Sequence, residues 1–121
     1  MSSPAPRCTV RVERKDGDVV VHLIDCDALN DQSMLALKTE LVALVENLGA
    51  VHVLLDLTGV RIVTSDGLGL IIILHTKLQA AGGRLTITGV NPAVYEVFEV
   101  TQLTRLFDVR LAEPTTKGKA G

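Results

Sequence analysis

A hydroxyl group at the start of a predicted helix is the feature of this sequence best suited to chemistry. The run Thr64-Ser65-Asp66-Gly67-Leu68-Gly69 follows a strand-like stretch and leads into a strongly apolar segment. The first backbone N–H groups of a helix have no partner within it, and the helix dipole leaves partial positive charge there, so an anion would be stabilised. Gly67 and Gly69 remove two side chains from the first turn, which would let a phosphate or a partner's backbone approach closely. The simpler interpretation is that Ser65 or Asp66 only caps the helix.

The sequence offers few groups for catalysis. His22, His52 and His75 are scattered along the chain, as structural histidines usually are. The segment 63–67 lacks the first glycine of a G-x-S-x-G nucleophile elbow, and the segment 67–72 has isoleucine at the third glycine of a dinucleotide fingerprint. The G-x-x-x-x-G-K-[ST] phosphate-binding motif is absent from the sequence, so a partner would have to supply any nucleotide. We therefore expect a binding module rather than an enzyme, with no catalytic residue, metal or cofactor.

Composition predicts a protein that neither binds nucleic acid directly nor enters a membrane. The net charge is −2, and one tyrosine and two phenylalanines are the only aromatic residues, so a basic stripe or stacking platform is missing. The longest apolar run, Gly67 to Leu74, is far shorter than the roughly 20 residues that span a bilayer. Cys8 and Cys26 have no metal-like spacing and follow no signal peptide, so we expect two reduced thiols in the cytoplasm and no structural disulfide.

Strands and helices alternate between two polar tails, at residues 1–7 and 113–121, that are expected to be flexible. Residues 8–112 are expected to form one domain. This order predicts an α/β domain with a mixed central sheet of about four to five strands, flanked by about three to four helices. Loops are expected at 15–18 and 25–30. The expected strands are 8–14, 19–24, 51–55, 84–88 and 106–109. The expected helices are 31–47, 66–81 and 92–100.

Three motifs together resemble the STAS domain of bacterial anti-sigma factor antagonists. They are Asp56-Leu57-Thr58-Gly59-Val60, the run from Thr64 to Gly69, and Gly82-Gly83-Arg84-Leu85 leading into Asn91-Pro92. The resemblance spans about Cys8 to Arg110. It implies a phosphorylation-switched binding module that, when unphosphorylated, captures an anti-sigma factor serine kinase and so frees a sigma factor. It also implies a PP2C-like phosphatase as a second partner, and it carries no signal for oligomeric state.

The resemblance assigns Ser65 as the phosphorylated residue, because the family's usual Asp-Ser-Ser-Gly-Leu-Gly places the modified serine at this position. Thr64 is the alternative, since related stressosome and lipid-transport STAS domains use threonine around this position. Asp27 falls where the family has an acidic residue in the loop before the first helix, and Asn30 takes the polar position after it. The implied partner-binding residues are Asp27, Asn30, Thr64, Ser65, Asp66, Gly67, Leu68 and Gly69.

Departures from the family pattern leave a second function open. Thr64 replaces the usual aspartate before the serine, Asp66 replaces the second serine, and Ile24 stands where a glycine often begins the turn after the strand. These changes also suit a non-phosphorylated STAS scaffold, or a subunit of a stressosome-type or lipid-transport complex. The fold is expected to be the same for both functions.

Overall fold

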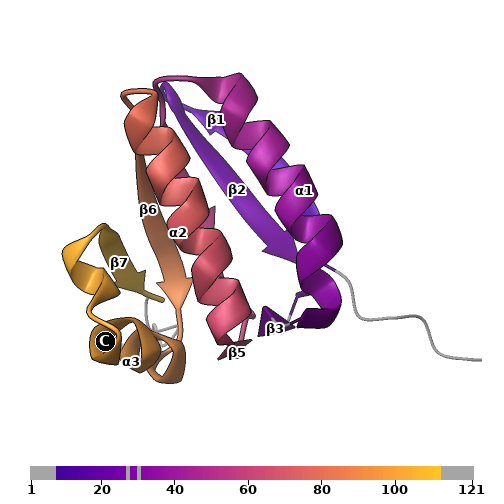
Figure 1. Cartoon of the computed structure of the whole chain (residues 1–121), viewed down its shortest axis with the longest axis vertical. Coiled ribbons are helices and arrows are strands. Elements are labelled where there is room, and N and C mark those ends of the chain that lie inside the picture. The colour runs from indigo at the N-terminus through magenta and orange to yellow at the C-terminus, as the bar shows by residue number, and fades with distance from the viewer. Residues whose placement is uncertain (1–7, 27, 30, 113–121) are drawn as a thin grey trace, which may run out of the picture.

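A mixed five-stranded sheet runs through the centre of the structure, a computed structural model that describes residues 8–26, 28–29 and 31–112 (Figure 1). The strand order is β1-β2-β4-β6-β7, with β1 and β2 antiparallel and the remaining pairs parallel. This arrangement confirms the predicted α/β class and the mixed sheet. The two predicted tails lie outside the described residues. The strands are β1 (Thr9–Lys15), β2 (Asp18–Ile24), β4 (His52–Asp56), β6 (Arg84–Val90) and β7 (Asp108–Leu111).

Two long helices, α1 (Asp31–Leu48) and α2 (Ser65–Ala80), lie side by side against one face of this sheet (Figure 1). The strands beneath them alternate in burial, as a sheet with one covered face should. Shorter α3 (Pro92–Val100) and the 3₁₀ helix η1 (Leu103–Arg105) lie beside β7. None of the described helices is long and apolar enough to cross a membrane. The inward-facing strand residues include Val19, Val21, Leu23, Val53, Leu55, Leu85 and Ile87.

A second, two-stranded sheet lies at the N-terminal ends of both long helices (Figure 1). It pairs β3 (Ala28–Leu29) in parallel with β5 (Ile62–Val63). The sequence predicts a loop at 25–30, so the strand at this position is a correction. Two-residue strands are too short to show an alternating pattern, and they pair here because the fold brings the segments preceding α1 and α2 together.

The end of the described chain also differs from the sequence prediction. The expected strand at 106–109 is found at Asp108–Leu111, and η1 occupies residues before it. Gln102 adopts a left-handed conformation with φ of 63°, which turns the chain away from α3. Leu103 and Phe107 are then buried, 7% exposed each, so their burial and not strand pairing fixes this segment.

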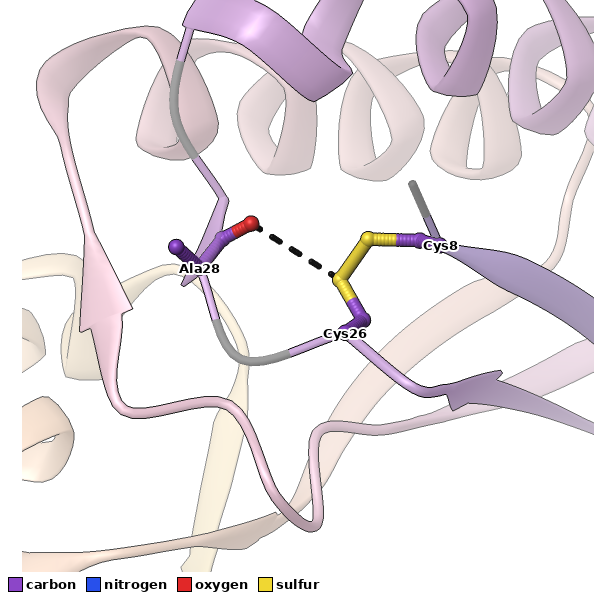
Figure 2. The surroundings of a disulfide bond; sticks show 3 residues. All are labelled: Cys8, Cys26 and Ala28. Atoms are coloured by element: carbon purple, nitrogen blue, oxygen red, sulfur yellow. Dashed lines mark hydrogen bonds between the residues drawn. A yellow bond between two sulfur atoms is a disulfide. The ribbon is translucent and has the colours of Figure 1, made fainter. Parts of the chain in front are cut away.

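Cys8 and Cys26 are joined by a disulfide, so the prediction of two reduced thiols was wrong (Figure 2). The antiparallel register places Thr9 opposite Ile24, which brings the residues flanking this pair together. Their Cα atoms are 4.5 Å apart, within the range that a disulfide requires. The 18-residue separation alone carries no such signal, because the proximity depends on the hairpin register.

Candidate functional site

Ser65 is the first residue of α2, and its side chain is exposed. Thr64 holds the N-cap position in an extended conformation, with ψ of 177°. Its side chain does not cap the helix: the hydroxyl and the backbone N–H of Thr64 both donate to the carbonyl oxygen of Leu29, at 3.1 Å and 3.0 Å. The interpretation that Ser65 or Asp66 caps α2 was therefore wrong, because the cap residue is Thr64 and its hydroxyl binds β3.

The two candidate phosphoacceptor hydroxyls differ in accessibility. Thr64 is half-buried, and its hydroxyl is occupied by the hydrogen bond to Leu29. The Ser65 side chain is exposed to solvent at the N-terminal end of α2, where the first N–H groups of a helix have no partner within it. Phosphorylation of Thr64 would break the hydrogen bond from its hydroxyl to Leu29, whereas phosphorylation of Ser65 would not. Ser65 is thus the more accessible of the two hydroxyls.

The two glycines of the first turn of α2 have different surroundings. Gly67 is buried, and a Cβ added there would lie 2.8 Å from both Cβ and O of Leu29 and 3.1 Å from Cγ1 of Val63. A Cβ on Gly69 would meet nothing within 4 Å. The expectation that both glycines open the turn to a ligand was therefore wrong for Gly67, which lets α2 pack closely against β3 and β5. Gly69 adjoins open space.

The remaining predicted residues of this turn lie close to Ser65. Asp66 is exposed, and Leu68 is half-buried against the hydrophobic core. Asp27 and Asn30 lie outside the described residues, so their positions beside this turn stay a prediction. The turn thus exposes the hydroxyl of Ser65 and the carboxylate of Asp66 to solvent, next to the apolar side chain of Leu68.

An apolar side chain that the sequence does not single out lies next to this turn. Ile62 on β5 is 57% exposed, whereas its neighbour Val63 points inward and is 8% exposed. Arg61 is also exposed. Ile62 is one of the most exposed large apolar side chains in the described structure, and it precedes Ser65 by three residues. A two-residue strand gave no pattern by which its outward orientation could have been predicted.

The loop after β4 is held rigidly beside the site. Oδ1 of Asp56 accepts hydrogen bonds from the backbone N–H and the hydroxyl of Thr58, at 3.0 Å and 2.6 Å. The N–H of Leu57 donates to the carbonyl oxygen of Thr88 at 2.9 Å. Gly89 has φ of 72°, and a Cβ there would collide with the Thr58 hydroxyl. The first STAS-like motif of the sequence therefore builds this turn.

Asn91 ties the same loop to α3. Its Oδ1 accepts a hydrogen bond from the N–H of Val94 at 2.8 Å, which caps the helix, and its Nδ2 donates to the carbonyl oxygen of Val60 at 3.3 Å. Pro92 occupies the first turn, where its missing N–H costs nothing. The predicted start of this helix at Asn91-Pro92 agrees with the structure.

A histidine lies between two carboxylates on the sheet face that the two long helices leave uncovered. Nδ1 of His22 lies 2.7 Å from Oδ2 of Asp56, and its Nε2 lies 3.0 Å from Oε1 of Glu13. The hydrogen bond with Glu13 raises the pKa of His22, and the hydrogen bond and charge of Asp56 raise it further. The same contact lowers the pKa of Glu13. Burial raises the pKa of Asp56, but hydrogen bonds from Thr58 and His22 lower it overall.

The three histidines lie at separate places in the fold. Nε2 of His52 is 2.7 Å from the hydroxyl of Thr86 on the next strand, and the ring of His75 packs against Phe107 with centroids 5.3 Å apart. Within the described part of the chain, acidic, histidine and cysteine side chains form no group of three or more placed to hold a metal.

An open hollow of about 510 Å³ separates the loops that follow β2 and β4. It lies at the carboxyl ends of these two parallel strands, the edge where open α/β sheets commonly bind ligands. Its walls are formed by Asp25, Cys26, Thr58 and Gly59. The disulfide is therefore part of the same edge of the molecule as the predicted site.

The sequence matches the family model of the STAS domain over residues 9–116. The chain belongs to the STAS domain family. STAS domains are binding modules rather than enzymes, which agrees with the scarcity of catalytic groups in the sequence. A search of the curated proteins gives no significant match.

Solved structures of several STAS proteins have the same fold. An anti-sigma factor antagonist from Mycobacterium paratuberculosis is 24% identical with a TM-score of 0.74, covering 91% of this chain and 90% of that chain. A STAS domain protein from Planctomyces limnophilus is 19% identical with a TM-score of 0.77, covering 86% and 90%. The anti-sigma factor antagonist SpoIIAA in its unphosphorylated form is 20% identical with a TM-score of 0.67, covering 84% and 87%. Bacillus SpoIIAA in its phosphorylated form is 17% identical with a TM-score of 0.62, covering 84% of this chain and 90% of that chain.

Proposed function

We propose that this chain is an anti-sigma factor antagonist whose binding is switched by phosphorylation of Ser65. In its unphosphorylated form it binds an anti-sigma factor serine kinase, and the sigma factor held by that kinase is released to direct transcription. The kinase supplies the bound nucleotide, and a PP2C-like phosphatase restores the unphosphorylated form. The protein acts in the cytoplasm and neither inserts into a membrane nor binds nucleic acid directly.

The observation that carries the proposal is the exposed hydroxyl of Ser65 at the first turn of α2. It lies on a surface that also holds the exposed side chains of Arg61, Ile62 and Asp66, which gives a partner apolar and charged groups to contact. The structural neighbour SpoIIAA is an anti-sigma factor antagonist with an unphosphorylated and a phosphorylated form. The shared fold and the accessible hydroxyl support the same kind of switch here.

The switch acts through charge at a fixed surface. In the transfer, Oγ of Ser65 forms a bond to the γ-phosphorus of ATP, and the bond from that phosphorus to the bridging oxygen breaks, so that ADP leaves with the electron pair. The hydroxyl proton passes to solvent. The phosphate adds about −1.5 to −2 charge at neutral pH, and the N–H groups of the first turn of α2 stabilise it on the free protein. A partner surface that carries carboxylates is repelled. Binding therefore changes while the fold is kept.

Phosphotransfer to the purified protein tests this proposal. The cognate anti-sigma factor serine kinase is incubated with ATP and with the wild type, Ser65→Ala or Thr64→Val, and the products are mapped by mass spectrometry. We expect one phosphate, on Ser65, in the wild type and in Thr64→Val, and none in Ser65→Ala. A phosphate on Thr64 in Ser65→Ala, or an unmodified wild type, would contradict the switch at Ser65.

The exposed carboxylate of Asp66 favours a second candidate function. A fixed negative charge next to Ser65 repels an incoming γ-phosphate, and it suits a STAS scaffold or a subunit of a stressosome-type or lipid-transport complex that is never phosphorylated. The neighbouring genes discriminate between the two functions. A serine kinase, a PP2C-like phosphatase or a sigma factor supports the antagonist, whereas permease and ATPase genes of a lipid transporter support the complex subunit.

A further inference from the structure

We propose that Cys8 and Cys26 form a reversible redox-modification site that controls how tightly the kinase partner is bound. The reagents it would take are low-molecular-weight thiols and their disulfides. The control of binding rests on the proposed function, whereas the redox chemistry and its effect on the fold do not.

The disulfide lies next to the segment that supports the first turn of α2. Figure 2 shows Cys8 at the start of β1 joined to Cys26 in the loop after β2, with the carbonyl group of Ala28 facing the bridge. Ala28 pairs with Ile62, which belongs to the proposed binding surface. The next residue, Leu29, accepts both hydrogen bonds from Thr64. The contact of Cys26 with the Ala28 carbonyl and the two hydrogen bonds from Thr64 to Leu29 therefore connect the bridge to the residue before Ser65.

The bridge is accessible from one side. Cys26 is 5% exposed and belongs to the core cluster, whereas Cys8 is half-buried at the beginning of an edge strand. Cys26 also forms part of the wall of the open hollow beside Thr58 and Gly59. A small thiolate can thus reach Sγ of Cys8 more readily than Sγ of Cys26.

Reduction proceeds by two exchanges whose atoms balance. A thiolate attacks Sγ of Cys8, the bond to Sγ of Cys26 breaks, and Cys26 leaves as a thiolate that takes up a proton. A second thiolate attacks the outer sulfur of the mixed disulfide at Cys8, which releases the small disulfide and the Cys8 thiolate. Oxidation by a small disulfide is the reverse sequence, and it returns two molecules of the small thiol.

The two redox states hold the loop after β2 differently. In the oxidised state Cys26 is anchored to β1, and its Sγ lies 3.8 Å from the carbonyl oxygen of Ala28 as a contact without a hydrogen (Figure 2). In the reduced state the anchor is lost, and the Cys26 thiol can only donate a weak hydrogen bond to that carbonyl. The loop then samples more conformations, and a partner must order it on binding, which lowers affinity.

The position of the bridge suits regulation more than stability. Cys26 belongs to the same core cluster as Leu23 and Leu29, so reduction loosens the loop locally and does not unfold the domain. Disulfides that form in a reducing compartment are usually transient or redox-sensing. A bridge that contacts β3, the strand paired with Ile62, therefore gives a second input to the switch, separate from phosphate.

Hydrogen exchange of the protein alone tests the redox site. The wild type is equilibrated with glutathione disulfide or with dithiothreitol, its redox state is checked by intact mass, and exchange is measured at the N–H of Thr64. We expect exchange at Thr64 to rise about threefold or more on reduction. The N–H of Arg84, bonded to Val51 at the far end of the sheet, is the internal control and should not change. Cys8→Ser should match the reduced wild type in both buffers.

Calorimetry with the cognate anti-sigma factor serine kinase tests the control of binding. We expect reduction to weaken binding by the wild type about threefold or more, and Cys8→Ser to bind equally in both buffers. Equal affinity of both redox states would overturn the control of binding, and a wild type that glutathione disulfide does not oxidise would overturn the redox site. Either result leaves the proposed function intact. If the kinase binds neither state, the proposed function fails and the control of binding fails with it, while the exchange result still decides the effect on the fold.

Discussion

The carbonyl oxygen of Leu29 accepts hydrogen bonds from both the N–H and the hydroxyl of Thr64, across 35 residues of sequence. Leu29 ends β3 just before α1 begins, and Thr64 ends the connection into α2. This contact therefore fixes the starting points of both long helices relative to each other. It also explains how a threonine can stand where the STAS pattern usually has an aspartate, because this hydroxyl serves the fold.

Thr64→Val should destabilise the protein, because valine keeps the shape of the side chain and loses one donor to Leu29. We expect a loss of about 1 kcal/mol in the free energy of unfolding, measured by urea denaturation. Ser65→Ala is the matched control, and it should change the same free energy by less than about 0.5 kcal/mol because Ser65 is exposed and does not cap α2. A larger loss in Ser65→Ala than in Thr64→Val would mean that the hydroxyl of Thr64 is not what fixes this junction.

Gly67→Ala and Gly69→Ala should have opposite effects on stability. The new Cβ at position 67 would meet Leu29 at 2.8 Å, so β3 or α2 must shift, at a cost of about 1 to 3 kcal/mol. At position 69 the Cβ meets nothing within 4 Å, and the higher helix propensity of alanine should stabilise the protein by up to about 1 kcal/mol. Thermal and urea unfolding of both variants measure this difference. Equal stability of the two would show that α2 does not pack against β3 as described.

The main elements could be predicted from the sequence because long periodic patterns report burial on one face. The apolar run preceding Asp56, and the long apolar helix after Ser65, fix the central strand and α2 within a residue or two. The candidate turn at residues 64–69 was found because a hydroxyl, two glycines and a helix start are all local signals. Features whose signal lies within a few consecutive residues could therefore be predicted from the sequence.

The remaining features depend on contacts between distant segments. The pairing of Ala28 with Ile62 rests on two residues per strand, and the disulfide of Cys8 rests on the register of a hairpin. Gly67 looked like an opening for a ligand because a sequence does not show that Leu29 fills the space beside it. In each case the deciding neighbour is more than fifteen residues away in sequence, so no local pattern could identify it.

His22 should contribute stability at mildly acid pH that is lost as the pH rises. Its contacts with Glu13 and Asp56 raise its pKa above the ordinary value of 6.5, so the folded state holds the proton more tightly. This stabilisation is fully present below about 6.5 and disappears as the pH passes through the raised pKa of the folded state. The carboxylates have lowered pKa values, so their share is present above their ordinary values and is lost only in strong acid.

Urea unfolding of the wild type and His22→Gln at about pH 5.5 and about pH 8.5 measures this effect. The difference in unfolding free energy between the two proteins should be larger at the lower pH. In addition, Glu13→Gln should lower the pKa of His22 in an NMR titration, whereas Glu46→Gln, which changes a carboxylate that pairs with Lys77, should leave it unchanged. A difference that grows towards the higher pH would refute the charged contact.

Ser65→Asp should weaken binding of the kinase partner without unfolding the protein, if charge at this position is the switch that we propose. One carboxylate at the first turn of α2 places about half the charge of a phosphoserine near the helix N-terminus. The helix dipole should stabilise it by about 0.3 to 1 kcal/mol, and because Asp66 already takes part of this benefit, the melting temperature should change little. Affinity for the kinase should fall at least about tenfold, or about 1.4 kcal/mol.

Ser65→Asn, with nearly the same shape and no charge, is the control and should bind like Ser65→Ala. Isothermal calorimetry of these variants against one kinase preparation separates charge from size: equal weakening by Ser65→Asn would assign the loss to size, and an undiminished affinity of folded Ser65→Asp would exclude charge at Ser65 as the switch.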